Sequence, residues 1–373
     1  MKKPITWIIV FAMALSLAAC GSNKEAEEVA TMKDAQTNIQ TDKENDTVKE
    51  PGEETATEDE EHAVEGLPVE SVEPAAEEFE YNYDAVLEGV KITGYNGEAR
   101  AIRIPAELDG EPVKQVSFTK NKNITHIELP DSVTEIGESA FSSCSSLIEI
   151  TIPNGVTMIG NSAFSSCSSL IEITIPNGVT KIDHNAFAYC SSLTEIIIPD
   201  SVTVIGQGAF GGCSSLTEIA IPNGVTGIGS FAFTDCSSLT EITIPNGATG
   251  IGESVFEGCS SLTKVTIPDS VTKIGESAFE GCSSLIEITI PNGVTEIGYY
   301  AFKGCSSLAE ITIPNGVTEI VQSVFEGCIS LRNLTIPDGV TEISYSPFRG
   351  CDGLKVTYQG QEYTYANDPG GWW

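Results

Sequence analysis

Apolar and polar residues follow a short pattern that returns every 23 residues along most of the chain. One copy is the segment 167–189, which begins Cys-Ser-Ser-Leu-Ile-Glu-Ile-Thr-Ile-Pro-Asn-Gly-Val-Thr-Lys-Ile and has Ala-Phe shortly before the next Cys. A fixed period of this length indicates a solenoid, in which each unit buries its apolar face against its neighbours. The pattern therefore predicts a chain of stacked coils.

Within one copy, each part of the coil has its own signal. Segment 172–175 alternates polar and β-branched apolar residues, which predicts a short strand with two inward isoleucines. Pro176 ends the strand and suits a type I turn. Val179 and Ile182 supply two more inward side chains, and segment 183–189 has helix-like spacing long enough for about one turn. The copy thus predicts an α/β repeat solenoid dominated by short parallel strands.

The repeated pattern C-x-S-L-x-x-I-x-I-P-x-x-V-T-x-I-x-x-x-A-F resembles the BspA-like leucine-rich repeat family, from roughly Ile102 to Leu354. The resemblance implies a right-handed leucine-rich repeat solenoid with capped ends. It also implies a bacterial surface or secreted protein with a binding role, since some members of that family are adhesins.

The ends of the repeat array depart from the pattern, as terminal repeats must in order to cover the exposed core. Phe118 and Asn121 stand where later copies have Phe and Cys, so residues 81–123 are predicted to form an N-terminal capping repeat. Residues 124–353 hold ten regular units. Residues 354–373 are predicted to form a closing hairpin around Gly360. The last residues are expected to be a frayed tail, although Trp372 and Trp373 could instead insert into a partner.

The first twenty residues have the features of an export signal. Lys2 and Lys3 precede an apolar run, and Leu17-Ala-Ala-Cys20 resembles a bacterial lipobox. The resemblance implies a lipoprotein signal peptide over residues 1–20 and lipidation of Cys20, which would anchor the protein to the cell membrane, facing outward. The alternative is an ordinary secretory signal in which Cys20 is incidental.

Residues 21–80 are rich in Asp and Glu and poor in apolar residues, which predicts a disordered acidic tether. Such a segment could be a stalk or an acidic tail that binds a ligand. The net charge of −34 argues against binding nucleic acid or anionic lipid, because both carry negative phosphates. Three histidines leave little material for acid–base or metal chemistry.

Ten cysteines keep the 23-residue period and could form disulfides or remain free. Equivalent Cβ bonds on stacked coils run parallel, which argues against disulfides. Asn121 lies in the same register, and the resemblance to leucine-rich repeats implies that Asn or Cys there is an inward group bonded to the turn backbone, so free buried thiols are favoured. A linear row does not converge on a point as zinc ligands must, and no metal or cofactor is expected. The predicted structural ladder is Asn121, Cys144, Cys167, Cys190, Cys213, Cys236, Cys259, Cys282, Cys305, Cys328 and Cys351.

Outward positions of the predicted strands form two polar rows that are the candidate binding face. The rows contain Glu149, Glu172, Glu195, Glu218, Glu241, Glu287 and Glu310, with Thr151, Thr174, Thr243, Thr266, Thr289 and Thr312 beside them. This face could bind a basic protein patch or divalent cations, or it could be a solvated surface that prevents aggregation. Every copy offers the same environment, whereas an active site needs a unique set of groups, so the sequence predicts no enzyme.

Two functions remain open from the sequence. The first is an adhesin-like surface protein, monomeric, that engages a host or neighbouring-cell protein or glycan through the solenoid face. The second is a structural component of the cell envelope without a specific ligand.

Overall fold

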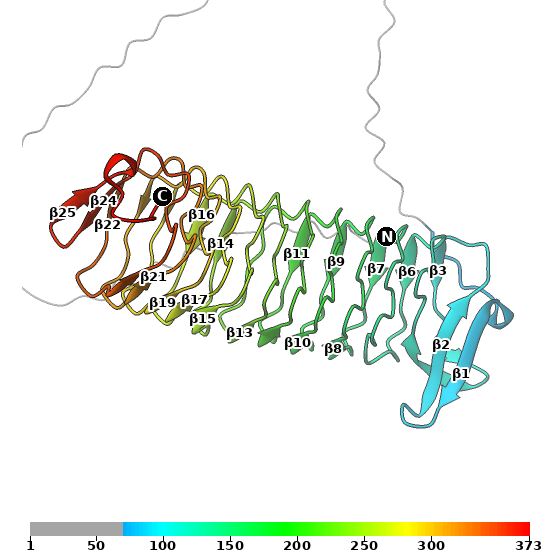
Figure 1. The fold of residues 1–373 in the computed structure, drawn as a ribbon. Helices are drawn as coiled ribbons and strands as arrows, with labels where there is room; N and C mark the ends of the chain where they lie inside the picture. Colours follow the sequence, from blue (N-terminus) through cyan, green and yellow to red (C-terminus); the bar gives the residue numbers. More distant parts are fainter. Residues whose placement is uncertain (1–69) are drawn as a thin grey trace, which may run out of the picture. The chain divides into compact units, whose positions relative to one another are not determined.

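The computed structural model describes residues 70–373, and Figure 1 shows their fold. The predicted signal peptide, Cys20 and residues 21–69 of the predicted tether lie outside the described residues. Residues 70–373 form stacked coils, each contributing a short strand to one or two rows of parallel strands. The predicted solenoid of 23-residue coils is confirmed.

The first row of strands follows the Cys-x-x-Leu segment in the regular coils and continues into the N-terminal cap. Its members are β3 (Ala101–Arg103), β6 (His126–Glu128), β7 (Glu149–Thr151), β9 (Glu172–Thr174), β11 (Glu195–Ile197), β14 (Glu241–Thr243), β16 (Lys264–Thr266), β18 (Glu287–Ile288), β20 (Glu310–Ile311), β22 (Asn333–Thr335) and β24 (Lys355–Tyr358). The register is in step with the repeat, because Ile196 lies opposite Ile173 and Glu195 opposite Glu172. Inward isoleucines are thus stacked on isoleucines, and outward carboxylates on carboxylates.

The second row follows the Pro-containing turn. Its members are β8 (Met158–Ile159), β10 (Lys181–Ile182), β12 (Val204–Ile205), β13 (Gly227–Ile228), β15 (Gly250–Ile251), β17 (Lys273–Ile274), β19 (Glu296–Ile297), β21 (Glu319–Ile320) and β23 (Glu342–Ile343). Pairing is again parallel and between equivalent residues, such as Ile182 with Ile205.

A column of stacked phenylalanine rings runs through the core. From Phe141 to Phe348, successive ring centroids are 5.3 to 6.1 Å apart, and the rings are close to parallel. All ten rings are fully buried. Phe118 continues the column with an edge-on contact to Phe141, in the register that the sequence predicted.

The segment between the second strand and the next Cys, which we call the corner, is a run of turns. The expected helical turn is wrong because the corner N–H groups bond to the neighbouring coil as well as to their own turn. Phe187 N donates to Ala209 O at 2.8 Å, while Ala188 N donates to Asn185 O, three residues back. Within residues 70–373 the helical segments are two 3₁₀ turns, η1 (Ala76–Glu78) and η2 (Tyr365–Asn367).

The N-terminal end is closed by a four-stranded sheet in the order β1-β2-β5-β4. These strands are β1 (Phe79–Asp84), β2 (Gly89–Tyr95), β4 (Glu107–Leu108) and β5 (Glu111–Val116). Residues 70–80 belong to this folded end and not to the tether as predicted. Val72 pairs with Ile102, and Phe79 is buried against Tyr95, because apolar side chains here cover the first coil.

The C-terminal end is closed by the predicted hairpin, in which β24 pairs antiparallel with β25 (Gln361–Tyr363). The expectation of a frayed tail is wrong. Phe348 N donates to Trp372 O at 2.9 Å, and Trp373 Nε1 donates to Cys351 O at 3.1 Å. Both indoles pack on Phe348, since this last ring of the column has no further coil above it.

Candidate binding surfaces

The outward side of the first strand row, which we call the strand face, carries both predicted polar rows. All of the predicted Glu and Thr side chains are exposed there. Paired strands bring Glu287 opposite Glu310, and the one lysine in the glutamate row, Lys264, lies 3.9 Å from Glu241. The face is therefore strongly acidic and almost uniform along the coils.

The strand face is interrupted in the middle. Residues 218–220 form no strand, so the coil between β11 and β14 contributes none to the first row. A groove of about 560 Å³ lies at this break, and Ile197 and Ala220 stand in it where other copies have Thr. The side chain of Ile197 is 66% exposed. We call this groove the notch, and its charged lining residues are Glu195, Glu218, Glu241 and Lys264.

The ten periodic cysteines lie inside the coils as free, buried thiols. Each thiol donates a hydrogen bond to a Phe carbonyl of the preceding coil, for example Cys167 to Phe141 at 3.1 Å. Burial raises the pKa of every one of these thiols, to about 11 at Cys144 and Cys351 and about 12 at Cys213. A neutral thiol is a weak donor suited to this dry position, but a poor nucleophile.

Asn121 occupies the same register in the capping repeat but bonds differently. Its side-chain oxygen accepts hydrogen bonds from the backbone N–H groups of Asn123 and Ile124, at 2.9 and 3.0 Å. It therefore stabilises its own turn, whereas each cysteine bonds to the coil before it.

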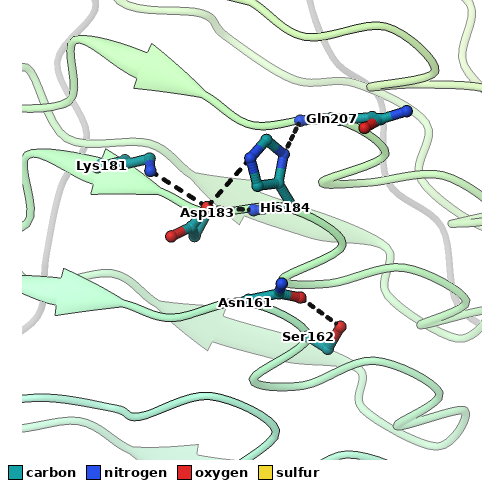
Figure 2. Close-up of polar contacts among 6 residues, drawn as sticks. All are labelled: Asn161, Ser162, Lys181, Asp183, His184 and Gln207. Carbon is teal, nitrogen blue, oxygen red and sulfur yellow. Dashed lines mark hydrogen bonds and ion pairs between the residues drawn. The ribbon is translucent and has the colours of Figure 1, made fainter.

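The corners hold polar groups that the repeat pattern did not point to. Asp183 Oδ1 accepts from the His184 N–H at 2.7 Å and lies 3.2 Å from Lys181 Nζ (Figure 2). Partial burial alone would raise the pKa of Asp183, but the His184 N–H and Lys181 outweigh it and lower that pKa. His184 Nδ1 in turn accepts from the Gln207 N–H of the next coil at 3.0 Å. The sequence signal for this cluster was its departure from the neighbouring copies.

Between residues 70 and 373, no three His, Cys, Asp or Glu side chains are grouped so as to hold a metal ion. No helix in this same range has the length and apolar character to cross a bilayer.

A solenoid of 23-residue coils, each burying one Leu and several Ile and Val residues on short parallel strands, is a leucine-rich repeat protein. The chain belongs to the family described as BspA type leucine rich repeat region, whose six-copy profile matches residues 111–240 and 226–355. The resemblance seen in the sequence is confirmed.

Solved bacterial proteins are similar in sequence and fold. A leucine rich repeat protein of T. pallidum is 35% identical over 57% of this chain and 90% of its own, with a TM-score of 0.45. A leucine rich cell surface protein from Faecalibacterium prausnitzii is 31% identical over 76% of this chain and 94% of its own, with a TM-score of 0.48. The pneumococcal vaccine antigen PcpA, at 18% identity over 76% and 80% with a TM-score of 0.52, shares the fold alone. No protein with a curated description matches the chain.

Proposed function

We propose that this chain is a non-enzymatic, cell-surface binding protein that engages a protein or glycan partner through the strand face. The notch is the observation that carries the proposal, because it places apolar side chains within an otherwise acidic and uniform surface. A partner with an apolar side chain between basic residues would complement Ile197, flanked by Glu195, Glu218 and Glu241. A similar protein described as cell-surface supports an exported location, and Cys20 is the proposed lipid anchor.

The second candidate is a structural component of the envelope. The uniformity of the strand face outside the notch favours it, since repeated exposed carboxylates also keep a solenoid soluble. In that case the acidic rows would have no specific ligand.

One experiment separates the two candidates. The full chain would be presented to immobilised matrix proteins, mucins and cell-wall glycans, with binding followed by surface plasmon resonance. The test variant reverses the notch charges with Glu195→Lys, Glu218→Lys and Glu241→Lys. The control variant, Glu253→Lys, Glu276→Lys and Glu342→Lys, makes the same change of charge on exposed residues elsewhere.

Saturable binding that falls at least about tenfold in the notch variant and is kept in the control supports the proposal. An equal loss of binding in both variants, together with binding that disappears at high salt, would indicate nonspecific electrostatic attraction and favour the structural role.

A further inference from the structure

Several residues that distinguish one copy from another lie at the corners of three successive coils. Tyr189 stands where earlier copies have Ser143 and Ser166, and Phe231 stands where most copies have Ser. The coil between them has Gly208, Gly211 and Gly212 in its corner. A specific ligand needs such unique residues, which are few on the regular strand face.

A hollow lies between the two aromatic residues, with Gly208, Gly211 and Gly212 in its lining. Its volume is about 320 Å³, and its lining includes Asn185, Tyr189, Gln207, Phe231 and Asp235. This volume lies near the lower end of the roughly 300–1,000 Å³ typical of small-molecule sites. It suits a ligand unit of one or two small rings.

The glycines allow two side chains of the preceding coil to lie close to the backbone. A Cβ at Gly212 would lie 2.6 Å from Tyr189 Cδ1, so the tyrosine ring rests directly on this backbone. A Cβ at Gly208 would lie 2.4 Å from the Asn185 side-chain oxygen. The tyrosine nevertheless stays 65% exposed, and the amide oxygen occupies the space above Gly208.

Contacts around the hollow hold its shape. His184 accepts from the Gln207 N–H and thereby ties the corner of one coil to the next, and Asp183 bonds to the His184 N–H (Figure 2). Phe231 has a φ of 62°, the left-handed conformation that the equivalent residues adopt in the other coils too, from Ser139 to Ser346.

The hydrogen-bonding groups that remain free for a ligand are on side chains. The backbone N–H groups of Asn185, Tyr189 and Gly212 already donate to carbonyls of the adjacent coil, at 2.7 to 2.8 Å. An extended peptide, which binds by backbone pairing to an open edge, would therefore find no donors here. The amides of Asn185 and Gln207 and the carboxylate of Asp235 offer both donors and acceptors.

We propose that this hollow is a carbohydrate-binding site, separate from the strand face. A pyranose ring would stack its C–H face on the exposed ring of Tyr189, while its hydroxyl groups bond to Asn185, Gln207 and Asp235. An aromatic wall with a few placed polar groups is the composition that such a ligand requires.

The test measures binding of glucose, galactose, mannose, N-acetylglucosamine and their β-linked disaccharides to the full chain by saturation-transfer NMR. Tyr189→Ser removes the stacking ring, and it keeps the fold because Ser143 and Ser166 have the same positive φ in this register. Gly208→Ser places a side chain against the Asn185 amide oxygen, which must then move, and leaves the tyrosine in place. The matched control is Tyr299→Ser, which removes a half-exposed tyrosine from the corner of a distant coil.

We expect at least one of these sugars to bind, with about a tenfold loss of affinity in Tyr189→Ser and in Gly208→Ser and little change in the control. The triple notch variant should bind the sugar unchanged, which separates this site from the proposed function. Absence of binding by every sugar, or binding indifferent to Tyr189→Ser, would overturn the proposal. The proposal would also be overturned if a proline-rich peptide bound at this corner and none of the sugars did.

Discussion

Each cysteine of the ladder is fully enclosed by its neighbours, and this decides its chemistry. In the middle of the ladder, Cys213 is 0% exposed and donates its thiol proton to Phe187 O at 3.2 Å. A thiolate there would lose both its solvation and this donor role, which is why the pKa is raised. The ladder is thus built to hold neutral thiols.

Alkaline pH should therefore destabilise the solenoid. The thiol pKa is raised in the folded state, to about 12 at Cys213, above its ordinary value of 9.0. The thiols therefore contribute their full stability below about pH 9, and this contribution is lost as the pH rises toward about 12. Thermal unfolding measured at increasing pH should show a falling midpoint above about pH 9.

The control is a variant with Cys213→Ala, Cys236→Ala and Cys259→Ala. It keeps all the tyrosines, which also titrate at alkaline pH, so its unfolding midpoint should depend less on pH if the thiols cause the effect. Denatured, non-reduced protein should also expose all ten ladder cysteines to a thiol reagent. A midpoint independent of pH, or almost no titratable thiol, would contradict the free-thiol ladder.

At the scale of the coil, the close approach of neighbouring turns sets which residues fit. A Cβ placed on Gly275 would lie 2.6 Å from the Gly252 carbonyl carbon, whereas a Cβ on Gly293 would meet nothing closer than 3.4 Å. The same close approach recurs at Gly206, Gly229 and Gly298. Other coils accommodate a side chain in this register, namely Asp183, Val321 and Ser344.

Gly275→Ala should therefore destabilise the protein by about 1–3 kcal/mol, because one coil must shift against the next. Gly293→Ala is the matched control, and its ordinary contact should change the free energy of unfolding by less than about 1 kcal/mol. Urea denaturation of the two variants measures the difference. Equal midpoints would show that the coils can separate there without cost.

At the scale of the whole folded unit, a stack of identical coils must be closed at both ends. The N-terminal sheet covers the first coil with Phe79 and Tyr95, and the last coil is covered by the hairpin and by Trp372 and Trp373. Without such covers the terminal core would meet water or another molecule.

Replacing both tryptophans, Trp372→Ser and Trp373→Ser, should open the last coil. Burial of each ring stabilises the last coil by about 2 kcal/mol. Loss of both rings should therefore speed up amide hydrogen exchange in residues 340–358, while residues 190–213 stay protected. Tyr365→Ser, at a site 62% exposed, is the control and should leave exchange unchanged. A uniform loss of protection along the array would contradict this prediction, because it would mean that the tryptophans stabilise the whole array and not only the last coil.

The repeat itself was readable from the sequence because one coil is specified many times. Inward Ile, Leu and Phe positions recur in step, so the strands, the core column and even Phe118 in the cap followed from the period alone. The corner was misread as a helical turn, because spacing within one copy cannot show that N–H groups bond to the adjacent coil. The tail was misread because its partner, Phe348, is recognisable as an uncovered ring only once the stack is built.

Periodicity was thus sufficient to establish the solenoid, its family and its acidic strand face, since these properties repeat and each copy reinforces the others. The notch and the corner hollow follow instead from contacts between coils. Ile197, Ala220, Tyr189 and Gly208 look like isolated departures along the chain. Stacking brings residues 23 positions apart into contact, and it is this stacking that turns those departures into two surfaces with a shape of their own.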